Sequence, residues 1–143
     1  MSLICPDETI LKSSAAKVAA TYHVEAGRLQ RAVELVKRGA VRRVANYDSI
    51  WRVSSDKAPR GYWTVNDETL VCDCPDWRRF NEPTSPQYVP NVPHTCKHIA
   101  SIFVLLTAQA EQTRRAAMPE TTLPAIMDHL FRQPLRKAAK AVQ

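Results

Sequence analysis

Apolar residues recur at intervals of three or four over the first third of the chain, with polar residues between them. This pattern predicts a helix over residues 7–22, for which Asp7 is a suitable N-cap. A second helix is predicted over residues 24–38, and Gly39 directly after it is a typical helix stop. The repeating apolar positions are Leu11, Ala15, Val18 and Tyr22 in the first helix and Leu29, Val33 and Val36 in the second.

The periodicity changes near residue 40, where apolar and polar positions begin to alternate. Short strands are predicted over residues 41–44, 50–54, 61–65 and 69–72, with turn-forming residues between them. Strands that follow one another through short turns favour antiparallel pairing, so we expect a small antiparallel sheet.

Proline and helical spacing organise the remainder of the chain. Five prolines within residues 75–95 predict an irregular surface loop, because proline cannot donate a backbone hydrogen bond. An apolar stripe of Ile99, Ile102, Phe103 and Leu106 predicts a third helix that begins at residue 96. A shorter helix is predicted over residues 125–133, after a linker bracketed by Pro119 and Pro124.

Length and charge narrow the classes of protein. A chain of 143 residues suits one domain, or one small domain with helical extensions. The longest apolar run, Ile102 to Leu106, is too short to cross a membrane, and no signal-peptide pattern is visible. We therefore expect a soluble intracellular protein in the reducing cytoplasm, without a membrane partner. The net charge of +6 permits an acidic partner such as nucleic acid.

Three of the four cysteines lie close together in the sequence. Cys72 and Cys74 are separated by one residue, a spacing that strains a direct disulfide, and Cys96 and His98 follow after a long spacer. Three thiolates and an imidazole are ligands that structural zinc prefers. A Cys-x-Cys pair at a strand end and a Cys-x-His pair at a helix start can direct all four ligands to one point. The sequence thus predicts one structural Zn²⁺ per chain.

Other residues near this pattern are weaker candidates as metal ligands. His94 is the main competitor for the fourth position, but it precedes the predicted helix and is expected in the loop. Asp73 and Asp76 are less favoured because hard carboxylates bind poorly beside thiolates. Cys5 stands alone and is expected to be a non-ligand. The plain alternative is that the clustered cysteines are small apolar core residues.

The residues around the four candidate ligands resemble the SWIM-type zinc finger. Residues 72–77 read Cys-Asp-Cys-Pro-Asp-Trp and residues 96–100 read Cys-Lys-His-Ile-Ala, which is similar to that family's Cys-x-Cys, variable spacer and Cys-x-His. The strand Tyr-Trp-Thr-Val at residues 62–65 also looks like the strand that leads into the motif. The resemblance covers about residues 40–110. It implies a ββα-like zinc module that contains a small antiparallel sheet. It also implies that the module binds DNA or proteins.

These observations combine into one expected architecture. We predict an α+β fold in which a small antiparallel sheet of three to four strands, with a zinc knuckle, is flanked by N-terminal and C-terminal helices. The expected division is an N-terminal helical segment (1–39), a SWIM-like zinc-binding module (40–115), and a linker with a C-terminal helix (116–143). No large catalytic domain accompanies the module, which favours a free-standing adaptor or nucleic-acid-binding protein.

Basic residues precede and follow the predicted zinc site. Arginine can bind phosphate through two hydrogen bonds, and a tryptophan can stack on an unpaired base. We therefore expect a nucleic-acid-binding accessory protein, with DNA as the foremost partner. The alternative is that these residues form an ordinary solvated surface. The candidate contacts are Arg38, Arg42, Arg43, Arg78, Arg79 and Trp77.

A protein-interaction adaptor for a recombination, transposition or other DNA-processing complex is the alternative function. The proline-rich loop 75–95 or the predicted helix 125–133 would carry the contact, unless that helix docks on its own domain. Enzymatic activity is not expected. Cys96 and His98 are better explained as ligands than as a nucleophile and its base, and the sequence has neither a glycine-rich phosphate loop nor a carboxylate cluster.

Overall fold

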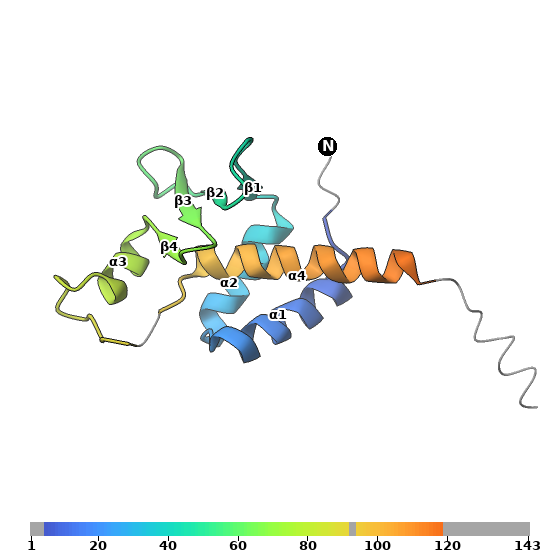
Figure 1. Cartoon of the computed structure of the whole chain (residues 1–143), viewed down its shortest axis with the longest axis horizontal. Coiled ribbons are helices and arrows are strands. Elements are labelled where there is room, and N and C mark those ends of the chain that lie inside the picture. Colours follow the sequence, from blue (N-terminus) through green and yellow to red (C-terminus); the bar gives the residue numbers. More distant parts are fainter. Residues whose placement is uncertain (1–4, 92–93, 119–143) are drawn as a thin grey trace, which may run out of the picture. The chain divides into compact units, whose positions relative to one another are not determined.

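Four helices and a four-stranded antiparallel sheet make up the described part of the chain, residues 5–91 and 94–118 of a computed structural model (Figure 1). This confirms the predicted α+β class. The described residues up to Gln112 form one compact unit. The elements in chain order are α1 (Glu8–Tyr22), α2 (Ala26–Lys37), β1 (Val41–Arg43), β2 (Ile50–Ser54), β3 (Tyr62–Asn66), β4 (Val71–Cys72), α3 (Pro75–Asn81) and α4 (Lys97–Ala117).

The ends of the first two helices follow the predicted capping residues. The Asp7 carboxylate accepts a 2.7 Å hydrogen bond from the amide of Thr9, which satisfies one free N–H at the start of α1. At the end of α2, Gly39 adopts a left-handed φ of +69°. The amides of Gly39 and Ala40 then donate back to the carbonyls of Val36 and Leu35, both at 3.0 Å, which completes a Schellman motif.

Replacing Gly39 with alanine is expected to lower the free energy of unfolding by about 1–2 kcal/mol, because the left-handed conformation is costly for a residue with a Cβ. The added Cβ would meet no atom within 4 Å, so the cost is one of backbone conformation alone. Gly27→Ala is the matched control. Its Cβ would make only ordinary contacts within α2, and the change should be neutral or stabilising. Urea denaturation would measure the free energy of unfolding of both variants. Equal changes in the two variants would contradict a special conformational role of Gly39.

The sheet is a meander in the order β1-β2-β3-β4, in which each strand pairs antiparallel with the next. Because side chains alternate along a strand, Trp51 and Val53 of β2 are buried while Arg52 between them is exposed. In Figure 1, α4 lies between the sheet and α1. The buried face of the sheet therefore packs toward the helices. We call the opposite face, which carries Arg42, Arg52 and Thr64, the outer face.

One hydrophobic core joins α1 and α2 to all four strands and to α4. The segment expected as an N-terminal helical region and the segment expected as a zinc-binding module therefore share their buried side chains. Partly buried aromatic residues, including Tyr22 stacked on Phe103 with ring centroids 4.4 Å apart, extend the core at its margin. The largest apolar side chains that are almost fully buried are Leu11, Val18, Val41, Val53, Val65, Ile99, Ile102 and Val104.

The expectation of an irregular loop over residues 75–95 was wrong for its first part, where the short helix α3 forms. Pro75 stands in the first turn, where a backbone N–H would have no partner within the helix, so its absence costs nothing. Asp76 adds a negative charge, which is favourable at the positive end of the helix dipole. Residues 82–91 contain turns and no helix or strand. The predicted helix over residues 125–133 lies outside the described residues. Within the described residues, no helix combines the length and apolar character needed to cross a membrane.

Candidate metal centre

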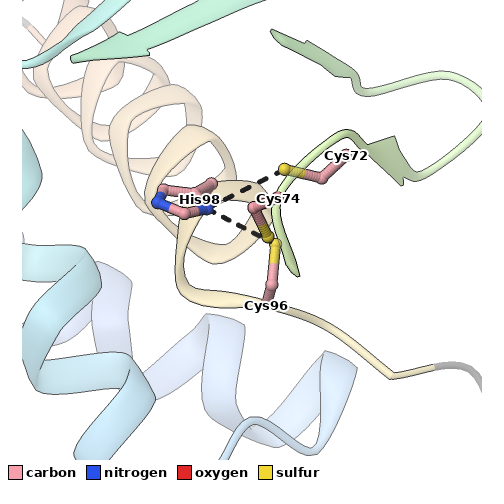
Figure 2. A group of neighbouring side chains, drawn as sticks. All are labelled: Cys72, Cys74, Cys96 and His98. Carbon is pink, nitrogen blue, oxygen red and sulfur yellow. Dashed lines mark hydrogen bonds between the residues drawn. The ribbon is translucent and has the colours of Figure 1, made fainter. Parts of the chain in front are cut away.

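The four predicted ligands come together at one buried point between the sheet and the start of α4. The ligating atoms of Cys72, Cys74, Cys96 and His98 all lie within 4.8 Å of one another. The Nδ1 atom of His98 is 3.8 Å from the Cys72 sulfur and 4.0 Å from the Cys96 sulfur (Figure 2). Tetrahedral zinc with bonds of about 2.0–2.3 Å separates its ligands by about 3.3–3.8 Å. The Cys₃His cluster thus has a zinc-finger-like arrangement that could hold a metal ion.

Local structure places the two thiols of the Cys-x-Cys pair. Cys72 ends β4, opposite Val65 of β3. Cys74 is the N-cap of α3, and its sulfur accepts a 3.3 Å hydrogen bond from the amide of Trp77. Asp73 between them exchanges hydrogen bonds with Thr64: its carboxylate accepts from the Thr64 amide at 2.8 Å, and its own amide donates to the Thr64 carbonyl at 3.2 Å. These bonds fix the turn that directs both sulfurs inward.

The Cys-x-His pair is placed by the beginning of α4. Cys96 immediately precedes the helix, and its carbonyl accepts the amide of Ala100 at 3.0 Å. His98 stands in the first turn and is buried, and its carbonyl accepts the Ser101 hydroxyl at 2.7 Å. Its Nε2 atom is buried without a hydrogen-bond partner among the described residues, and its ring lies beside Trp63 with centroids 6.3 Å apart. Packing therefore orients the imidazole so that Nδ1 faces the sulfurs.

The three thiols strongly perturb one another. The hydrogen bond with Cys72, and to a smaller extent the one with Cys96, holds the pKa of the Cys74 thiol far below its ordinary value. The pKa of Cys72 is raised far above its ordinary value by its hydrogen bonds to Cys74 and Cys96 and by burial. The pKa of Cys96 is raised to about 12, because the hydrogen bond to Cys74 and burial outweigh the lowering effect of the bond with Cys72. A bound cation would favour the thiolate form of all three cysteines.

The competing ligand candidates are engaged elsewhere. His94 stacks on Phe80 with ring centroids 4.2 Å apart, and its Nε2 lies 3.5 Å from the Asp76 carboxylate. Asp76 also accepts hydrogen bonds from Arg28 of α2 at 3.3 and 3.4 Å, which ties α3 to the N-terminal helices. Cys5 is exposed and lies outside the cluster. Sequence reasoning did not find the Arg28 contact, because nothing local links residues so far apart.

The arginines predicted to contact nucleic acid occupy two parts of the molecule. Arg42 and Arg43 belong to β1, and the Arg43 guanidinium lies 4.6 Å from the ring centre of Trp51. Arg38, at the end of α2, donates to the carbonyl of Ser54 at 3.4 Å. All three arginine side chains are exposed near the β1 end of the sheet.

The other predicted contacts belong to α3. Arg78 and Arg79 are exposed, and Arg78 forms a 3.8 Å ion pair with Glu82. Trp77 is half-buried against the core, and its indole N–H donates to the carbonyl of Leu70 at 2.9 Å. The structure therefore gives Trp77 a packing role at the zinc-finger-like cluster.

Sequence reasoning missed Arg52. The alternation over residues 50–54 places it outward, but only the register shows that it lies directly opposite Arg42. A cavity of about 420 Å³ was also not expected; it is lined mainly by the α1–α2 connection, Leu70, Phe80, Val89 and His94.

Comparison with known proteins gives no relative: no family model, curated protein or solved structure matches this chain. The resemblance to SWIM-type zinc fingers therefore rests on the motif residues. The structure shows in addition that the four candidate ligands of this motif lie together in one cluster.

Proposed function

We propose that this chain is a SWIM-type zinc module that uses one structural Zn²⁺ and acts as a small nucleic-acid-binding accessory protein, with DNA as its partner. The observation that carries the metal assignment is the convergence of four buried Cys and His ligands within 4.8 Å. Four protein ligands complete a tetrahedral shell and leave no position for a catalytic water. We accordingly propose a binding role and not an enzymatic one.

The proposed metal would connect the end of the sheet to α4. Cys72 and Cys74 hold it from the β4–α3 side, and Cys96 and His98 hold it from the helix start. Three thiolates and one Zn²⁺ together carry one negative charge, which Lys97 between two of the ligands is placed to offset. The metal would thereby hold together the two ends of the connection between Cys74 and Cys96.

Exposed arginines support the nucleic-acid part of the proposal. Within the described residues, Arg38, Arg42 and Arg43 form no ion pair with a carboxylate, although all three are exposed. Guanidinium groups without an acidic partner are available to phosphate oxygens. Binding through phosphate contacts would have a weak sequence preference and a steep dependence on salt.

Reversing two of these charges tests the proposal. The double variant Arg42→Glu, Arg43→Glu is expected to weaken DNA binding and flatten the plot of log affinity against log salt, because phosphate contacts release fewer counterions. Fluorescence anisotropy of a labelled DNA at several salt concentrations measures both quantities. Circular dichroism controls for folding. Unchanged affinity in the folded double variant would exclude these two arginines as DNA contacts, and a zinc-loaded wild-type protein that binds no DNA would contradict the nucleic-acid role.

An adaptor role is the second candidate, favoured by apolar exposure beside the cavity. Leu70, Val71 and Val89 are exposed, and two of them line the 420 Å³ cavity. Such a surface suits the apolar side chains of a protein partner. The adaptor would be supported by a partner that survives nuclease treatment in a pull-down and is lost in the variant Leu70→Glu, Val89→Glu, together with no affinity of the wild-type protein for DNA.

A further inference from the structure

Two arginines lie directly opposite each other on the outer face of the sheet. The register pairs Arg42 of β1 with Arg52 of β2, and Arg52 with Thr64 of β3. Like charges at directly opposed strand positions repel each other. Both arginines are exposed, and neither forms an ion pair within the described ranges 5–91 and 94–118. The outer face therefore presents two adjacent positive charges that the described residues do not neutralise.

An aromatic ring and a helix end add to this pair. The Arg52 guanidinium lies 4.5 Å from the ring centre of Tyr62 on the neighbouring strand. Stacking of this kind orders a guanidinium while leaving its N–H groups free to donate. Arg38 borders the same strand, because it donates to the carbonyl of Ser54 at the end of β2. We call Arg38, Arg42 and Arg52 the outer arginine surface.

We infer that the outer arginine surface binds the phosphate backbone of double-stranded DNA. This inference rests on the proposed function and names the contact surface. Two of its three charges, Arg42 and Arg52, stand on paired strands, so their spacing is set by the sheet and not by a flexible tail. Rigidly spaced guanidiniums suit the regular phosphates of a duplex.

The aromatic side chains argue against base stacking as the main contact. Single-strand binding relies on free aromatic faces. The ring of Tyr62 has Arg52 over it, and Trp77 is half-buried with its indole N–H bonded to Leu70. Tyr47, the most exposed aromatic residue of the described ranges, lies in the connection between β1 and β2. The strands that carry Arg42 and Arg52 thus offer charge without a free aromatic face, which favours a duplex.

A matched pair of double variants tests this inference. Arg42→Gln with Arg52→Gln removes two charges from the outer face, and Arg78→Gln with Arg79→Gln removes two exposed charges from α3. Anisotropy titrations of the zinc-loaded full chain use a short labelled duplex and one of its single strands over a range of KCl concentrations. The outer-face variant should bind the duplex at least about tenfold more weakly near 0.1 M salt, with the salt slope reduced by about 1.8. The α3 variant should stay within about twofold of wild type.

Single variants guard against a folding defect in the double variant. Arg52→Gln and Arg31→Gln each remove one exposed guanidinium, but Arg52 lies on the outer face whereas Arg31 lies on α2, among the helices toward which the buried face packs. Arg52→Gln should lower the salt slope by about one, and Arg31→Gln should change it less. Equal zinc content and melting temperature would show that each variant is folded.

Different failures have different meanings. If the α3 variant loses affinity and the outer-face variant keeps it, the inference is wrong while the proposed function stands. Tighter binding to the single strand than to the duplex would also overturn the inference alone. If zinc-loaded wild-type protein binds neither DNA, the proposed function fails and the inference fails with it.

Discussion

Cys96→Ser is expected to abolish stoichiometric zinc binding and to unfold the part of the chain around the metal centre. Zinc binding to structural sites of this kind contributes about 10–16 kcal/mol at neutral pH. The total stability of a domain is about 5–15 kcal/mol, so the metal can decide whether the fold forms at all. Native mass spectrometry would report one zinc per wild-type chain and none in the variant. Circular dichroism would report the loss of helix and sheet, and a chelator should reproduce both effects.

Cys5→Ser provides the control for this experiment. It makes the same chemical change at an exposed cysteine outside the cluster, so zinc content and folding should be those of wild type. A wild-type chain that is folded and free of metal would overturn the zinc assignment. The cluster would then have to be explained as an ordinary buried core of small apolar side chains.

Leu11→Ala is expected to destabilise the whole described fold by about 2–5 kcal/mol, because it leaves a cavity in a closely packed core. Leu11 is 1% exposed and belongs to the same core cluster as the strands and α4. Since α1 and the sheet share that core, removing the Leu11 side chain should lower the midpoint of a single cooperative unfolding transition that includes the sheet. Thermal or urea unfolding followed by far-UV circular dichroism and by tryptophan fluorescence would measure it.

The two optical probes make this prediction specific. Trp51 and Trp63 lie in the sheet, whereas Leu11 lies in α1. If the helical segment 1–39 folded independently of the zinc-binding part, tryptophan fluorescence would keep its wild-type midpoint in Leu11→Ala. Leu70→Ala is the matched control, because it deletes the same atoms from an exposed position and should cost far less.

Most elements were predictable because their signals are local. The strand over residues 50–54 was predicted with its observed bounds, and the cap at Asp7 and the helix stop at Gly39 were confirmed. Helix α3 was not predicted, because the five prolines within residues 75–95 indicate an irregular loop. Cys74 as a cap, Pro75 in the first turn and Asp76 beside it were the available signal.

The fold class and the set of four candidate ligands could be predicted from the amino-acid sequence. Short spacings such as Cys-x-Cys and Cys-x-His constrain where neighbouring side chains can point, so they can be interpreted without knowledge of distant contacts. The contacts between residues far apart in the chain became visible in the three-dimensional structure. It placed Asp76 with Arg28, His94 against Phe80, and Arg52 opposite Arg42. Such contacts depend on strand register and on where the whole core places α3 relative to α2, and neither leaves a periodic trace in the chain.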